Sequence, residues 1–128
     1  MAIRIVRLGS PRHPREGLRI GAVRRPPRAV PKAEYAARDW FDVWYPELAP
    51  SAETLKLHRA ATTPAQFTAF LKRYRAEMNE PAARRTIELL AALSKQTDFS
   101  LGCYCEDDRH CHRSVLRALL ADSGARFA

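Results

Sequence analysis

The segment that most constrains the fold is FSLGCYC (99–105), a short apolar run placed after a helical pattern. A run of this length favours a buried central strand over a helix. The chain then passes through a polar loop into CHRSVLRALLADSG (111–124), a helical pattern that Gly124 is placed to close in the left-handed conformation. A strand that leads through a loop into a helix predicts an α/β protein.

The N-terminal part of the chain predicts two further strands. Residues 2–8 alternate between apolar and polar side chains and are rich in β-branched residues, which favours a strand over a helix. Residues 18–24 give a second strand, and the turn-forming residues 9–17 separate the two. Residues 25–32 contain three prolines, which restrict their neighbours to extended conformations. We therefore expect an extended basic loop there.

The middle of the chain is helical. Ser51 is a good N-cap for a helix through about Arg59, and Thr63 begins a second helix with Pro64 at its first position and Gln66 completing a capping box. Five residues at helical spacing predict the core side of this second helix: Phe67, Phe70, Leu71, Tyr74 and Met78. A third helix begins at Pro81, and its apolar side is predicted to be Ile87, Leu90 and Leu93.

These patterns together predict one α/β domain over residues 1–128. We expect a small domain with a short, mostly parallel sheet flanked by helices. Residues 1–32 would form its basic strand and loop region, and residues 99–124 its last strand, loop and helix. The aromatic segment RDWFDVWYP (38–46) is predicted to be buried and partly extended, next to a pocket.

The positive charge of the chain is concentrated in its first quarter. The formal net charge is +8, and residues 1–32 carry nine basic residues against the single acid Glu16. The remaining residues balance, with 13 basic and 13 acidic side chains. A localised positive field of this kind attracts polyanions, although exposed arginines also serve simply to solvate a surface. We expect a phosphate-bearing partner, with Arg24, Arg25, Arg28 and Lys32 supplying charge.

Cysteine content and hydropathy bear on the compartment. No stretch approaches 18 consecutive apolar residues, so no membrane partner is expected. The chain has three cysteines, all within residues 103–111, which is unlike the disulfide framework of a secreted protein. We therefore expect a cytoplasmic protein, and the patterns indicate no cofactor.

The cysteine-rich corner permits several interpretations. Cys111 lies at the predicted start of a helix beside His112 and Arg113, where a thiolate or another anion is stabilised, and Cys105 is a partner or resolving thiol. Asp107 or Asp108 is a competing candidate for the helix cap. The alternative is structural, with the cysteines packed as small apolar residues. Thiol chemistry, anion binding and a structural corner all stay open.

Zinc binding is a further possibility for this corner. Cys103, Cys105, Cys111 and either His110 or His112 offer four ligands. However, the spacing is C-x-C-x5-C-H, and zinc knuckles use paired C-x2-C ligands. We predict that no metal is bound.

Three stretches resemble a known family. RRPPRAVPKAEYAARDWFDVWYPELAPSAETL (24–55), FLKRYRAEM (70–78) and CYCEDDRHCHRSVLRALL (103–120) resemble the bacterial domain-of-unknown-function family 488, which includes the YeaO-like proteins. The resemblance spans about residues 3–124. It implies a small cytoplasmic α/β domain and assigns no activity, cofactor or substrate.

The resemblance also groups three marked parts of the chain. They are the basic loop (residues 24–32), the segment that holds Asp42, Trp44 and Ser51, and the Cys111-His112-Arg113 corner. We expect these parts to meet in one cleft, with Asp42, Trp44 and Ser51 lining it.

The leading hypothesis is a binding or processing domain for a nucleotide or nucleic acid. In it, Arg113 would contact phosphate together with the basic loop. One alternative is a thiol-dependent enzyme or redox sensor in which Cys105, Cys111 and His112 are catalytic. The other alternative is a zinc-stabilised interaction module. The patterns favour neither catalysis nor simple binding.

Overall fold

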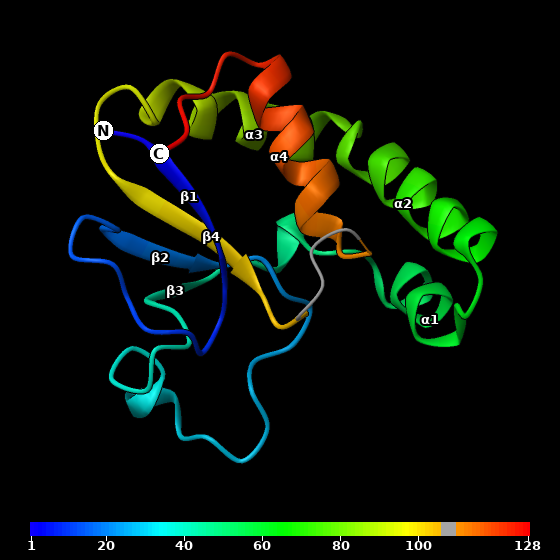
Figure 1. The fold of residues 1–128 in the computed structure, drawn as a ribbon, viewed down its shortest axis with the longest axis horizontal. Coiled ribbons are helices and arrows are strands. Elements are labelled where there is room, and N and C mark those ends of the chain that lie inside the picture. Colours follow the sequence, from blue (N-terminus) through cyan, green and yellow to red (C-terminus); the bar gives the residue numbers. More distant parts are fainter. Residues whose placement is uncertain (106–109) are drawn as a thin grey trace.

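The computed structural model describes residues 1–105 and 110–128, which form a four-stranded sheet with helices packed on it (Figure 1). The strands are β1 (Ile3–Arg7), β2 (Leu18–Gly21), β3 (Val43–Trp44) and β4 (Phe99–Cys103). Their order is β1-β4-β2-β3, and all three pairs are parallel. All five residues of β4 are buried, as its apolar run predicts for a strand with neighbours on both sides. The α/β prediction is confirmed.

The helices begin and end close to their predicted positions. They are α1 (Ala52–Ala60), α2 (Pro64–Met78), α3 (Pro81–Leu93) and α4 (His112–Asp122), with short 3-10 helices η1 (Lys32–Glu34) and η2 (Pro46–Leu48). Ser51 caps α1 by accepting from the Thr54 N–H, and Thr63 and Gln66 form the predicted capping box of α2. Gly124 adopts a φ of 86° after α4, which confirms the predicted left-handed close. None of the helices in the described part of the chain is long and apolar enough to cross a membrane.

The main core joins one face of the sheet to α2, α3 and α4. Ile3, Phe99 and Leu101 of the strands pack in one cluster with Tyr74 of α2 and Leu120 of α4. The predicted core face of α2 is confirmed for Phe70, Tyr74 and Met78, which are buried, whereas Phe67 and Leu71 are half-buried. The predicted face of α3 is wrong at its end, where Leu93 remains 38% exposed. In this last turn of α3 the buried side is formed by Ala91 and the following Ser94, which are 1% and 0% exposed.

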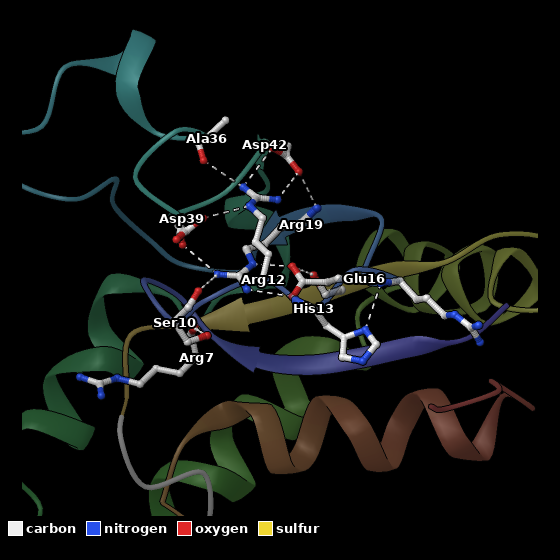
Figure 2. A network of polar contacts seen from close by, with 11 residues as sticks. Arg7, Ser10, Arg12, His13, Glu16, Arg19, Ala36, Asp39 and Asp42 are labelled. Atoms are coloured by element: carbon white, nitrogen blue, oxygen red, sulfur yellow. Dashed lines mark hydrogen bonds and ion pairs between the residues drawn. The ribbon is translucent and has the colours of Figure 1, made fainter.

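A buried ion pair lies on the other face of the sheet (Figure 2). Arg19 of β2 is 0% exposed and Glu16 is 2% exposed. The guanidinium donates to both carboxylate oxygens, from Nε to Oε2 at 2.6 Å and from Nη2 to Oε1 at 2.8 Å. Ser100 of β4 donates a third hydrogen bond to Oε2 at 2.9 Å. The pair therefore ties the loop after β1 to the two central strands.

A second ion pair joins the same loop to the aromatic segment (Figure 2). Both terminal nitrogens of Arg12 donate to the carboxylate of Asp42, at 2.9 and 3.1 Å, and Arg12 Nε faces Asp39 at 3.4 Å. Asp42 also accepts from the backbone N–H of Arg19 at 2.8 Å. Arg12 and Arg19 are thus neutralised within the fold, so the positive charge of residues 1–32 is only partly available to a partner.

The aromatic segment is less buried than its composition predicts. Phe41 is 2% exposed and packs against Gly21, whereas Val43 and Trp44 of β3 are 38% and 43% exposed. The prediction of a buried segment is therefore wrong for β3. It is the edge strand of the sheet, and an edge strand two residues long leaves its side chains open to solvent.

Candidate functional site

A large open cavity lies at the carboxyl ends of the parallel strands. Its volume is about 1550 Å³, and Leu8, Val23 and Cys103, which end or follow β1, β2 and β4, contribute to its wall. The strands finish level with one another, because Arg7 pairs with Cys103 and Gly21 with Gly102 in the sheet register. This edge is where ligands bind in open α/β sheets.

Cationic side chains dominate the charge of the cavity. Arg7, Arg25, Arg28 and Arg59 line it and are exposed, and the half-buried His58 lies beside them. No aspartate or glutamate occurs among the described residues that line it. The described wall is therefore suited to an anion.

The basic loop divides into residues that hold the fold and residues that face solvent. Arg24 lines the cavity, but its guanidinium donates to the carbonyls of Pro46, Ala49 and Pro50 at 3.0–3.3 Å. It therefore closes the turn before α1. Arg25 and Arg28 have exposed side chains at the cavity. Lys32 is exposed in η1 and does not line the cavity.

Two tryptophans and a tyrosine line the cavity beside the arginines. Trp44 is held by a hydrogen bond from its indole N–H to the Val23 carbonyl at 2.8 Å. Trp40 packs edge-on against Tyr104 with ring centroids 5.8 Å apart, and the Tyr104 hydroxyl donates to the Arg25 carbonyl at 2.8 Å. These contacts fix the rings next to the arginines, where a planar base can stack on them.

Two residues expected in the cleft lie elsewhere. Asp42 is paired with Arg12 and accepts from the backbone N–H of Arg19 in β2, and Ser51 caps α1. Neither lines the cavity, whereas Trp44 does. The expected meeting of the basic loop, the aromatic segment and the cysteine corner therefore occurs at the cavity, whose lining includes Arg25 and Arg28, Trp44, and His112.

The three cysteines converge at one end of the cavity. Cys103 is the last residue of β4 and is 1% exposed, while Cys111 is the N-cap of α4 and is 0% exposed. Cys105 follows β4, is half-buried, and lines the cavity. All three are free thiols, and the sulfurs of Cys103 and Cys111 lie within 4.8 Å of each other. We call these three residues the sulfur cluster.

The cap of α4 differs from the sequence-based expectation. Cys111 itself is the N-cap, so the expectation of Asp107 or Asp108 is wrong, and both aspartates lie outside the described residues. Cys111 makes no side-chain capping hydrogen bond. Its sulfur lies 3.6 Å from Nδ1 of His112 instead.

His112 is buried between the sulfur cluster and the sheet. Its Nε2 lies 2.7 Å from the Ala22 carbonyl oxygen, which can only accept, so Nε2 carries the proton. Burial lowers the pKa of His112 to about 4, so the ring is neutral at pH 7 and Nδ1 has a free lone pair. That atom lies 3.6 Å from Cys111 Sγ. His112 is therefore a fixed proton acceptor for the Cys111 thiol.

Arg113 is buried beneath the cavity wall. It is 5% exposed, it does not line the cavity, and its Nη2 donates to the Cys105 carbonyl at 2.6 Å. Among the described residues, its Nε is buried without a hydrogen-bond partner. Arg113 is therefore placed to act on the sulfur cluster rather than on a ligand in the open part of the cavity.

A metal ion would find three ligand atoms here. One atom each of Cys103, Cys111 and His112 lies within 4.8 Å of the other two. A structural zinc site needs four ligands, so this group is one short of a closed tetrahedral set. The absence of zinc stays a prediction.

The sequence patterns missed several residues of this wall. Arg59, His58 and Tyr104 were not singled out, although they line the cavity with Trp40. The one sequence signal for the histidine was its place near the end of a predicted helix. Only the fold brings His58 and Arg59 of α1 to the cavity at the ends of β2 and β4.

The site defines an α/β protein with an arginine-lined cavity and a Cys-His-Arg corner at the carboxyl edge of its sheet. A family model covers residues 3–124, nearly the whole chain, and its description is "Active DUF488-N3 subclade". The chain belongs to the DUF488 family, within the group named DUF488-N3a. Searches of curated proteins and of solved structures gave no match.

Proposed function

We propose that the cavity binds a phosphate-bearing ligand, a nucleotide or a nucleic-acid strand, as a small binding or processing domain. The observation that carries this proposal is the wall itself. Arg25, Arg28 and Arg59 are exposed at the cavity, and no carboxylate occurs among its described lining residues. Guanidinium groups bind phosphate through paired charge-assisted hydrogen bonds.

The aromatic rings favour a nucleotide over a bare anion. Trp40, Trp44 and Tyr104 lie along the same cavity, so a base can stack while its phosphate meets the arginines. Base stacking contributes about 1–3 kcal/mol, which is comparable to a charged hydrogen bond. The arginines would thus bind the phosphate of a nucleotide, and the neighbouring aromatic rings would bind its base.

Competition binding tests this function. Fluorescence anisotropy of a labelled single-stranded oligonucleotide is measured at low salt, with adenosine triphosphate and adenosine as competitors. The triphosphate is expected to compete, whereas adenosine, which lacks phosphate, is not. Competition at micromolar triphosphate identifies a nucleotide pocket, and competition only by longer strands identifies a nucleic-acid site.

A matched pair of variants shows whether the cavity is the binding site. Arg25→Ala with Arg28→Ala should weaken binding by about tenfold or more, since each charged contact contributes about 1 kcal/mol. Arg84→Ala with Arg85→Ala on the exposed side of α3 removes equal charge outside the cavity and should have little effect. The proposal fails if no nucleotide or oligonucleotide binds at low salt, or if both pairs weaken binding equally.

A further inference from the structure

The cavity crosses the whole carboxyl edge of the sheet. Its lining includes residues at or just after the end of all four strands, from Arg7 of β1 at one side of the sheet to Trp44 of β3 at the other. Neighbouring strands lie about 4.8 Å apart, so this path is about 14 Å long. The volume of about 1550 Å³ also exceeds the roughly 300–1,000 Å³ of a pocket for a small molecule. A single nucleotide would therefore fill only part of the cavity.

Positive charge is distributed along this path. Arg7 ends β1, Arg25 and Arg28 lie in the basic loop after β2, and Arg59 lies in α1. All four side chains are exposed at the cavity. One phosphate group can contact the arginines at only one point of the wall, whereas a nucleic-acid strand carries a phosphate at every nucleotide, about every 3.4 Å in a helix. The distribution of the charges therefore suits a chain of phosphates.

Two exposed aromatic rings are anchored to the same backbone segment as the loop arginines. The Trp44 indole N–H donates to the Val23 carbonyl, and the Tyr104 hydroxyl donates to the Arg25 carbonyl, both at 2.8 Å. Although they are large aromatic residues, Trp44 and Tyr104 are 43% and 36% exposed. Aromatic side chains held beside positive charge are the surfaces on which the bases of single strands stack. The wall therefore offers separate places for at least two bases.

The orientation of the rings favours unpaired bases. Trp40, the third ring of the wall, meets Tyr104 edge-on, with an interplanar angle of 77° and ring centroids 5.8 Å apart. Two rings at nearly a right angle cannot both stack on the parallel bases of one duplex. In a duplex the bases also cover one another's faces, whereas a single strand can turn each base to a separate ring.

We infer that the ligand of the cavity is an unpaired nucleic-acid strand, of which about two to four nucleotides lie across the carboxyl edge of the sheet. Its bases stack on Trp44 and Tyr104, and its phosphates meet Arg25, Arg28 and Arg59. This inference rests on the proposed function, because it names which phosphate-bearing ligand the cavity takes. A mononucleotide binds more weakly, since it makes only a fraction of these contacts.

The length of the ligand separates a strand from a nucleotide. Thymidine monophosphate and thymidine oligonucleotides of two, four and eight nucleotides compete with a labelled strand on the unmodified protein, followed by fluorescence anisotropy. Affinity should rise about tenfold or more from the monophosphate to the tetranucleotide, because further bases and phosphates are bound, and should then level off. Equal affinity for the monophosphate and the tetranucleotide would overturn the inference and leave the proposed function standing. Binding of none of them would refute both.

Two further competitors test the contacts of the rings. A longer strand of mixed sequence is compared with the same strand annealed to its complement, and with an abasic strand of equal length that keeps the phosphates but has no bases. At physiological salt, the duplex and the abasic strand should each compete about tenfold or more less well than the single strand. Equal competition by the abasic strand would show that phosphates alone are bound, and equal competition by the duplex would show that the bases need not be unpaired. Either result would overturn the inference.

Intrinsic fluorescence reports stacking at Trp44. The chain has two tryptophans, and both line the cavity. A bound strand should quench their emission, and Trp44→Leu should lose about half of the quenching and about tenfold in affinity. Leu89→Ala, at a 58% exposed side chain of α3 outside the cavity, is the control and should behave as the wild type does. Unchanged affinity and quenching in Trp44→Leu would contradict the inference. If circular dichroism shows that this variant is unfolded, the abasic and duplex competitors decide on the wild-type chain.

Discussion

Replacing Glu16 by glutamine tests how much the buried Glu16–Arg19 ion pair contributes to the stability of the fold. The substitution keeps the size of the side chain and removes the charge that Arg19 faces. Arg19 is 0% exposed, and its bonds to the two carboxylate oxygens are 2.6 and 2.8 Å long. Leaving a buried charge uncompensated costs about 3–5 kcal/mol. For a chain of this length, that loss corresponds to a fall in melting temperature of about 10–20 °C.

The loss of stability caused by Glu16→Gln should be larger at neutral pH than in acid. Burial opposes ionisation, but hydrogen bonds from Arg19 and Ser100 lower the pKa of the Glu16 carboxyl below the ordinary value of a glutamate. A group with a lowered folded-state pKa contributes stability above its unfolded pKa and loses it as pH falls through the folded value. The difference between wild type and variant should therefore be full at pH 7 and shrink in acid below about pH 4.

Urea denaturation followed by circular dichroism measures this difference. The matched control is Glu53→Gln, whose carboxylate faces Arg73 at 3.3 Å with both side chains at least half exposed. An exposed pair contributes about 0–1 kcal/mol, so this control should change little. A loss of less than about 1 kcal/mol for Glu16→Gln at pH 7, or equal losses for the two variants, would refute the role given to the buried pair.

Four further outcomes follow from the structure. Gly102→Ala should destabilise the chain by about 1–3 kcal/mol in urea, because an added Cβ would lie 2.9 Å from the Val6 carbonyl oxygen. Tyr74→Phe should cost about 1–2 kcal/mol in the same assay, because it removes the buried 2.7 Å hydrogen bond to the Leu48 carbonyl. Elemental analysis of the purified protein should find no tightly bound zinc. Saturating adenosine triphosphate should slow alkylation of Cys105 by iodoacetamide, because the sulfur lines the proposed ligand cavity; an unchanged rate would place the ligand elsewhere.

Local patterns predicted the elements well where short-range chemistry decides them. The capping box of α2 needs only Thr63 and Gln66, which are three residues apart, and the structure contains it. The apolar run of β4 likewise predicted a central strand, because only a strand with neighbours on both sides buries all five residues. Such features depend on residues close in sequence.

The charges of the first quarter could not be assigned in the same way. Arg12 finds its partner 30 residues away in Asp42, and Arg24 finds three carbonyls 22 to 26 residues away. Arg19 is fully buried beside Glu16, although its type predicts a surface position. Charge counting treats these arginines alike, whereas the fold uses three of them internally and leaves Arg25 and Arg28 at the cavity.

The sequence predicted where the cysteine corner lies, but not that Arg113 is buried there. A strand followed by a loop and a helix predicted that Cys103 and Cys111 would meet at the carboxyl edge of the sheet, and their sulfurs lie within 4.8 Å. The sequence favoured Arg113 as a phosphate ligand. Its burial depends on the tertiary packing at the start of α4, where its guanidinium donates to the Cys105 carbonyl.

The salt dependence of nucleic-acid binding is the most direct test of the arginine-lined cavity. Binding of a labelled single-stranded oligonucleotide is measured over a range of salt concentrations for the wild type and for Arg25→Ala with Arg28→Ala. Each phosphate contact contributes about 0.7 to the log–log slope on single strands, so losing two contacts should flatten the slope by about 1.4. An unchanged slope for this variant, or a wild-type chain that binds no phosphate-bearing ligand at low salt, would contradict the account.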